Sequence, residues 1–136
     1  MGAPHDNRGP GGRAPEFRRG ERAAALVAER RGGTVLARNY RKNGGEVDLV
    51  VETGDRVIAF VEVKTRTTDA FGSGLESVTP SKQRRVARAA VAFLGERGLA
   101  DRPCRFDVAV VEPSGDRCSV RWLEGAFAVE CEEDLQ

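Results

Sequence analysis

Two adjacent apolar segments near the middle of the chain constrain its fold more than any other feature. Residues 46–52 (EVDLVVE) and 56–65 (RVIAFVEVKT) are rich in β-branched and aromatic residues, and the intervening Thr53-Gly54-Asp55 is typical of a hairpin turn. In the second segment both alternating sets of side chains are apolar, which is typical of a central strand covered on both faces. The sequence therefore predicts a sheet with packed layers on each side.

Helix and strand patterns flank this hairpin. Residues 16–31 have helical periodicity and end at Gly32-Gly33, and a second helix is predicted from Pro80 to about Gly98, with Thr79 as its N-cap. Further strands are predicted at 34–38, 104–111 and 117–123. This order predicts an α/β fold with a central mixed sheet of about five strands flanked by helices.

Length and composition indicate one soluble domain. Of the 136 residues, 40% are hydrophobic and 32% charged, which is sufficient for one buried core. We expect the domain to span residues 16–129, between a flexible tail at 1–15 and an acidic tail at 130–136. The sequence has no apolar run near the ~20 residues of a membrane span and no secretory signal, so we expect a cytoplasmic protein that does not bind membranes.

The cysteines and the single histidine argue against a structural zinc site. Cys104, Cys118 and Cys131 are widely spaced and form no CxxC pair, while His5 lies in the predicted tail. An odd number of cysteines without a secretory signal favours a reducing compartment.

Charge is unevenly distributed along the chain. Residues 1–42 hold ten Lys/Arg and four Asp/Glu, whereas residues 101–136 hold four and nine. The basic part suits a phosphate backbone, although ordinary solvated surfaces explain the charge equally well.

Three charged residues in the central hairpin form a candidate catalytic centre. Strand alternation places Asp48 on one face of its strand and puts Glu62 and Lys64 together on one face of the next. Phosphodiester hydrolysis requires neutralisation of a transition state with extra negative charge and a positioned water. Mg²⁺ meets the first requirement and binds one or two carboxylates while retaining several waters. Lys64, about 6.5 Å along the strand from Glu62, is then placed to orient the water and stabilise the phosphate.

The same alternation predicts which residues lie behind this centre. The face of the first strand opposite Asp48 is expected to carry Val47, Leu49 and Val51. Glu21, in the first predicted helix, falls within the apolar stripe of that helix, where an acidic residue is out of place.

Structural explanations of these charges stay open at the level of the sequence. A Glu62–Lys64 or Asp48–Lys64 ion pair explains the buried charges without any chemistry. For Glu21 the alternative is a surface position on a misjudged face of its helix. Whether Lys64 or solvent takes a proton from the attacking water is also left open.

A wider set of residues resembles the YraN-like family of bacterial proteins, which are predicted endonucleases distantly similar to archaeal Holliday junction resolvases. The resemblance covers residues 16 to 129 and lies in Gly20-Glu21, RNYR at 38–41, GGEVDLV at 44–50, FVEVKTR at 60–66, Phe71-Gly72, Val78 with Lys82, RFDV at 105–108 and Ala126-Phe127. It implies a restriction-endonuclease-like core in which Asp48, Glu62 and Lys64 occupy the catalytic positions. It also implies a catalytic role for Glu21 and a metal held by Asp48, Glu62, Val63 and Glu21.

Basic residues near this centre are candidates for binding nucleic acid through its phosphates. Four precede the hairpin or follow it closely and two belong to the second helix, and the full set is Arg38, Arg41, Lys42, Arg66, Lys82 and Arg85. A solvated helix face is an equally good explanation for the helical members.

The expected function is a Mg²⁺- or Mn²⁺-dependent DNA endonuclease, nonspecific or selective for a structure such as a Holliday junction. A four-way junction has two-fold symmetry, so the resolvase analogy implies a homodimer. The alternative is a non-catalytic module that binds nucleic acid or protein on the same fold. The residues alone also leave RNA open as a substrate.

Overall fold

A computed structural model describes the backbone of residues 5–6 and 15–18 and the complete residues 19–66 and 78–129. Its elements follow one another as β1 (His5–Asp6), α1 (Pro15–Arg30), β2 (Thr34–Lys42), β3 (Gly45–Glu52), β4 (Ile58–Thr65), α2 (Pro80–Glu96), β5 (Cys104–Ser114) and β6 (Arg117–Phe127). The six strands form one sheet in sequence order. The β1–β2 and β4–β5 pairs are parallel and the other three are antiparallel, so the sheet is mixed.

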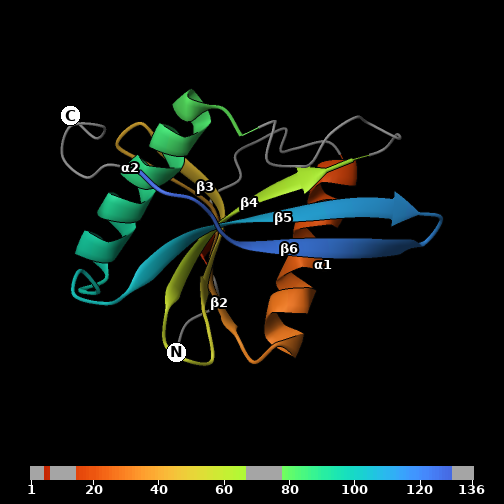
Figure 1. The fold of residues 1–136 in the computed structure, drawn as a ribbon, viewed down its shortest axis with the longest axis horizontal. Coiled ribbons are helices and arrows are strands. Elements are labelled where there is room, and N and C mark those ends of the chain that lie inside the picture. The colour runs from red at the N-terminus through yellow and green to blue at the C-terminus, as the bar shows by residue number, and fades with distance from the viewer. Residues whose placement is uncertain (1–4, 7–14, 67–77, 130–136) are drawn as a thin grey trace.

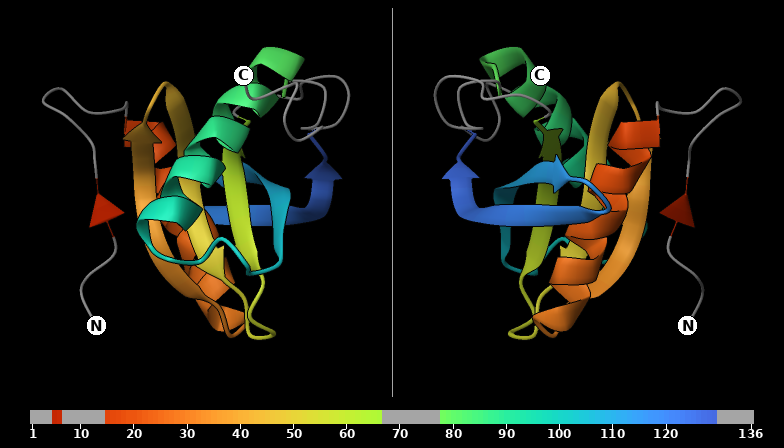
Figure 2. Two further views of the ribbon diagram at one scale, coloured as in Figure 1. Left: turned by 90° about the vertical axis from the view of Figure 1, so that its left-hand side faces the viewer. Right: turned by 90° about the vertical axis from the view of Figure 1, so that its right-hand side faces the viewer.

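The two helices cover opposite faces of this sheet (Figure 1; Figure 2). On the α1 face, alanines of α1 pack against alternate residues of β3 and β4, such as Leu49 and Val61. On the α2 face, Phe93 packs against the intervening set, including Val50 and Phe60. β4 is therefore buried on both faces, which confirms the predicted central strand and the α/β fold.

β2, β5 and β6 extend beyond the ranges that the sequence patterns predict, whereas β4 begins two residues later, at Ile58. β2 was predicted to end at Arg38 but continues to Lys42, which pairs with Gly45. Asn43 and Gly44 form a two-residue turn with φ of 55° and 79°, and Asn-Gly is the preferred pair where both residues need positive φ. His5–Asp6 adds a two-residue sixth strand within the region predicted as a tail.

Gly45 sets the distance between α2 and the sheet. It is buried, and a Cβ on this residue would lie 2.2 Å from the backbone N of Ala89. A side chain here would displace the helix backbone, so glycine allows α2 to lie directly on β3. The middle of α2 is thereby held against β3, one of the strands that bear the charged residues.

One predicted face is wrong. Val47 packs with Val50 on the α2 face, whereas Leu49 and Val51 pack on the α1 face, so simple alternation fails between residues 47 and 49. Neighbouring Asn39 of β2 has a φ of 50°, which departs from strand geometry at this level of the sheet.

No helix within the described residues has both the length and the apolar character needed to cross a membrane. Residues 67–77, between β4 and α2, lie outside the described residues.

Candidate active site

The site lies where β3 and β4 part. Their ladder runs from Glu52–Ile58 to Leu49–Val61 and has no further register pairs. β3 continues to pair with β2, and β4 continues to pair with β5 as far as Thr65. At this end of the sheet β3 and β4 are therefore no longer paired, and a gap lies between them.

Asp48 takes over the role of the missing ladder partner. Its Oδ2 accepts a hydrogen bond from the backbone N–H of Val63 at 2.8 Å, and the residue is only 3% exposed. The N–H and C=O of one strand residue point to the same edge of the strand, so the Val63 carbonyl is also directed toward β3. The gap thus holds a fixed carboxylate and a backbone carbonyl side by side.

A cavity of about 340 Å³ occupies this position, between β3, β4 and the start of α2. It brings together three of the four predicted catalytic residues, Asp48, Glu62 and Lys64, with Val63. The lining residues are Arg41, Glu46, Asp48, Glu62, Val63, Lys64, Lys82, Arg85 and Val86.

Lys64 is half-buried, and within the part of the chain that the structure describes no carboxylate lies within 4.0 Å of its ammonium. The described residues therefore do not form the Glu62–Lys64 or Asp48–Lys64 ion pair that would have explained these charges without any chemistry. The ammonium adds positive charge beside the two carboxylates of the cavity.

The rim of the cavity is basic. α2 begins with Thr79 as its N-cap, whose hydroxyl accepts from the Lys82 N–H at 3.2 Å, as predicted for Thr79 and Pro80. This cap places Lys82 and Arg85 over the cavity from the helix side, while Arg41 approaches from β2.

Glu46 is the acidic residue of this rim, and no pattern in the sequence points to it. It forms ion pairs with Arg85 and, at 3.6 Å, with Arg41. The contact between Glu46 and Arg85 joins residues 39 positions apart, so only the docking of α2 on β3 reveals it.

The other three predicted nucleic-acid contacts do not line the cavity. Lys42 pairs with Glu96 at 2.7 Å, near the far end of α2. Arg38 pairs with Asp6 in the register between β2 and β1, and the backbone N–H of Arg66 donates to Val111 of β5 at 2.8 Å. Of the predicted set, the structure gathers Arg41, Lys82 and Arg85.

Glu21 is buried in the apolar stripe of α1, as its periodicity predicts. It is 5% exposed, and its Oε1 accepts a hydrogen bond from Asn39 Nδ2 at 3.1 Å. The alternative of a surface residue on a misjudged face is therefore wrong. Glu21 is not among the lining residues of the cavity, so the structure does not bring it together with Asp48, Glu62 and Val63 as the predicted metal ligands required.

The donors that do meet in the cavity suit a hard cation. No group of three or more His, Cys, Asp or Glu side chains arranged to hold a metal occurs in the described residues. The cavity offers the carboxylates of Asp48 and Glu62 and the carbonyl of Val63. Mg²⁺ is bound through one or two carboxylates with several waters kept, so this donor set fits Mg²⁺ rather than Zn²⁺.

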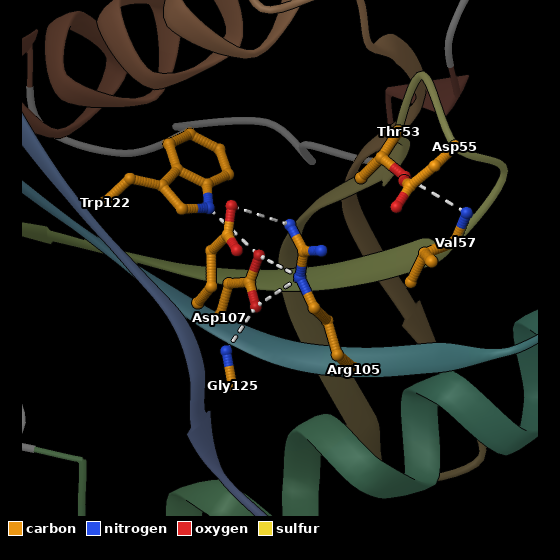
Figure 3. Close-up of polar contacts among 8 residues, drawn as sticks. Thr53, Asp55, Val57, Arg105, Asp107, Trp122 and Gly125 are labelled. Carbon is orange, nitrogen blue, oxygen red and sulfur yellow. Dashed lines mark hydrogen bonds and ion pairs between the residues drawn. The ribbon is translucent and has the colours of Figure 1, made fainter.

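Another buried carboxylate, Asp107 of β5, is structural. It is fully buried and accepts from Arg105 Nε, Trp122 Nε1 and the Gly125 N–H at 2.9–3.0 Å (Figure 3). These donors come from β5 and β6, at a break in the regular register between those strands. The contacts from Trp122 and Gly125 join β5 to β6, while Arg105 pairs with Asp107 within β5.

Comparison with known sequences places the chain in a family. Residues 20–111 match the family described as uncharacterised protein family UPF0102. A UPF0102 protein of Hahella chejuensis is 40% identical over 111 residues, which cover 82% of this chain and 88% of that protein. The UPF0102 protein of Symbiobacterium thermophilum is 46% identical over 109 residues, covering 79% and 92%. One from Moorella thermoacetica is 47% identical over 110 residues, covering 79% and 91%.

These matches confirm the family resemblance seen in the sequence motifs. The matched region contains GGEVDLV and FVEVKTR, which form the two sides of the gap between β3 and β4. It also contains RFDV, which lies in the neighbouring strand β5. The chain belongs to the protein family UPF0102.

Proposed function

We propose that this protein is a Mg²⁺-dependent DNA endonuclease of the restriction-endonuclease-like class. The observation that carries the proposal is the convergence of Asp48, Glu62 and Lys64 on one cavity at the point where β3 and β4 part. Two carboxylates, a backbone carbonyl and an ammonium without a carboxylate partner in the described residues match the needs of phosphodiester hydrolysis.

The residues divide the work by their chemistry. Asp48, fixed by the Val63 N–H, and Glu62 provide oxygen ligands for the cation. Bound Mg²⁺ supplies positive charge to the phosphate and lowers the pKa of a nearby water. Lys64 stabilises the negative charge that develops on the phosphate and helps to orient the attacking water.

The basic rim suggests how DNA is held. Arg41, Lys82 and Arg85 line the same cavity as the acidic centre, where they can contact phosphates flanking the bond to be cleaved. Contacts of this kind carry no sequence information. We therefore propose cleavage that is nonspecific or selective for DNA structure.

The proposal is tested by incubating the purified chain with a four-way junction, a flap and a linear duplex, with Mg²⁺ or with chelator. Wild-type protein is expected to nick at least one substrate only when Mg²⁺ is present. Glu62→Gln should abolish nicking, whereas Glu112→Gln, an exposed position on β5, should leave it unchanged.

The rival function, a non-catalytic binding module, makes the opposite prediction. Wild-type protein that binds these DNAs but cleaves none of them, and that shows no Mn²⁺ binding heat by calorimetry, would favour the module and reject the nuclease.

A further inference from the structure

Asn39 lies inside β2 with an unusual backbone conformation. Its φ is 50°, in the left-handed region, and only 1% of its surface is exposed. Residues other than glycine rarely adopt this conformation inside a strand, and Asn tolerates it better than most. Strained, buried positions of this kind are concentrated at functional sites.

The side chain of Asn39 is directed at one group. Its Nδ2 donates to Glu21 Oε1 at 3.1 Å, and this is the only hydrogen bond that the Asn39 side chain makes within the described residues. Its Oδ1 is buried and has no donor in that part of the chain. Leaving a buried acceptor without a donor costs free energy. The Asn39 amide nevertheless keeps this orientation, in which its Nδ2 can donate to the Glu21 carboxylate. The contact with Glu21 therefore determines how the amide is oriented.

Asn39 also lies next to the acidic centre. The register pairs Arg38–Leu49 and Tyr40–Val47 flank it, so it lies across the ladder from Asp48, about 5 Å away between Cα atoms. On its other side Asp48 is held by the Val63 N–H. Asp48 is therefore placed between a strained residue of β2 and the open end of β4.

The start of α1 reaches the same end of the sheet. A Cβ on Gly20 would lie 2.3 Å from the hydroxyl oxygen of Thr65, so the helix lies directly on the end of β4. Glu21 follows Gly20, and Thr65 follows Lys64. The Glu21 carboxylate therefore lies on the α1 face at this end of the sheet, outside the cavity itself.

We infer that Asn39 is a positioning residue of this site: its amide holds the Glu21 carboxylate next to the strand segment that carries Asp48. This inference rests on the proposed nuclease function. Asn39 does not touch the substrate and acts through Glu21.

The test uses Asn39→Gly, because glycine accepts the positive φ without strain and removes only the amide. Its matched control is Asn43→Gly, which makes the same change at an exposed turn residue with a φ of 55°. Asn39→Gly is expected to lower the single-turnover cleavage rate about 10- to 100-fold, and Asn43→Gly to leave it unchanged. Cleavage by Asn39→Gly at the wild-type rate would show that only the backbone conformation matters and would overturn the inference.

A double-mutant cycle separates positioning from a general structural role. If Asn39 acts through Glu21, the rate of the Asn39→Gly/Glu21→Gln double variant should equal that of Glu21→Gln alone. Rate losses that multiply would overturn the inference. If Asn39→Gly does not fold, Asn39→Asp, which tolerates the same φ, is used in a reversal test. The carboxylate introduced by Asn39→Asp faces the Glu21 carboxylate with a like charge, and Glu21→Gln reverses the hydrogen bond, so the double variant should recover part of the rate that Asn39→Asp loses. No recovery would overturn the inference.

A metal-free readout completes the test. In the NMR spectrum of the apo protein, the side-chain amide protons of Asn39 should exchange slowly, and Glu21→Gln should shift their resonances. Fast exchange with no shift would contradict the contact on which the inference depends. Wild-type protein that cleaves no DNA would instead reject the proposed function, and the inference with it.

Discussion

The backbone N–H of Val63 donates to the carboxylate of Asp48 at 2.8 Å, in the gap where β3 and β4 no longer pair. One side chain therefore does two things. It satisfies a backbone donor that the sheet leaves without a ladder partner, and it holds a negative charge beside Glu62 and Lys64.

This double role predicts that two substitutions of Asp48 will behave differently. Asp48→Asn keeps an oxygen that can accept from Val63, so its free energy of unfolding should stay within about 1 kcal/mol of the wild type, while Mn²⁺ binding and cleavage are lost. Asp48→Ala leaves the N–H unsatisfied and should cost about 1–3 kcal/mol more than Asp48→Asn. Urea unfolding and calorimetry measure the two effects. Equal stability of the two variants would mean that the Val63 contact contributes nothing.

Glu46 predicts a gain of DNA affinity. It is paired with Arg41 and Arg85, so its charge reduces the attraction of the rim for phosphate. Glu46→Gln should tighten DNA binding roughly twofold to fivefold. It should also make the slope of the logarithm of the binding constant against log salt more negative by about one. Fluorescence anisotropy over a salt series measures both quantities, and Glu112→Gln serves as the control. Weaker binding by Glu46→Gln would show that Glu46 orients the arginines and does not oppose them.

Tyr40 gives a pH prediction that can be read directly, because it is the only tyrosine. Burial of the phenol, with its hydrogen bond to Glu96 at 2.8 Å and the charge of that carboxylate, raises the pKa of Tyr40 to about 12. Because the pKa of Tyr40 is higher in the folded state, the protonated phenol stabilises the fold. This contribution to the free energy of unfolding is complete below the unfolded pKa of about 10 and is lost as the pH rises toward 12. Absorbance at 295 nm should follow this titration, and Glu96→Gln should lower the midpoint. A midpoint near 10 in folded wild-type protein would contradict the contact.

Asp107 predicts a large loss of stability without a specific effect on the chemistry. Its carboxylate is fully buried among donors from Arg105, Trp122 and Gly125, and removal would leave a partly buried guanidinium without its main partner. Asp107→Ala should lower the free energy of unfolding by about 3–5 kcal/mol. Trp122 is the only tryptophan, so its emission should also move to longer wavelength as β6 loosens. A change below about 1 kcal/mol would show that the buried network is not what joins β5 to β6.

Much of the fold was predictable because its signals are local. The apolar faces of residues 58–65 identify the central strand, and Thr79-Pro80 identifies the start of α2. Alternation also placed Glu62 and Lys64 on one face, and helical periodicity placed Glu21 in the buried stripe of α1.

The parts that were not predictable depend on contacts between distant segments. The pairs Glu46–Arg85 and Lys42–Glu96 join residues 39 and 54 positions apart, and the close contact of Gly45 with Ala89 determines them by fixing where α2 lies. The face of Val47 was mispredicted because alternation assumes regular strands, whereas Asn39 beside it has a positive φ.

Lys64 provides the most direct test of the account. Lys64→Met keeps much of the aliphatic stem and removes only the charge, and no carboxylate in the described residues pairs with it, so folding should be unaffected. Arg121→Met, which removes an exposed charge on β6, is the matched control. The deciding measurement is the single-turnover rate of DNA cleavage in Mg²⁺. A loss of roughly 100- to 1,000-fold for Lys64→Met, with no change for Arg121→Met, is the predicted result. Equal rates for Lys64→Met and wild-type protein would contradict the assignment of this cavity as the active site.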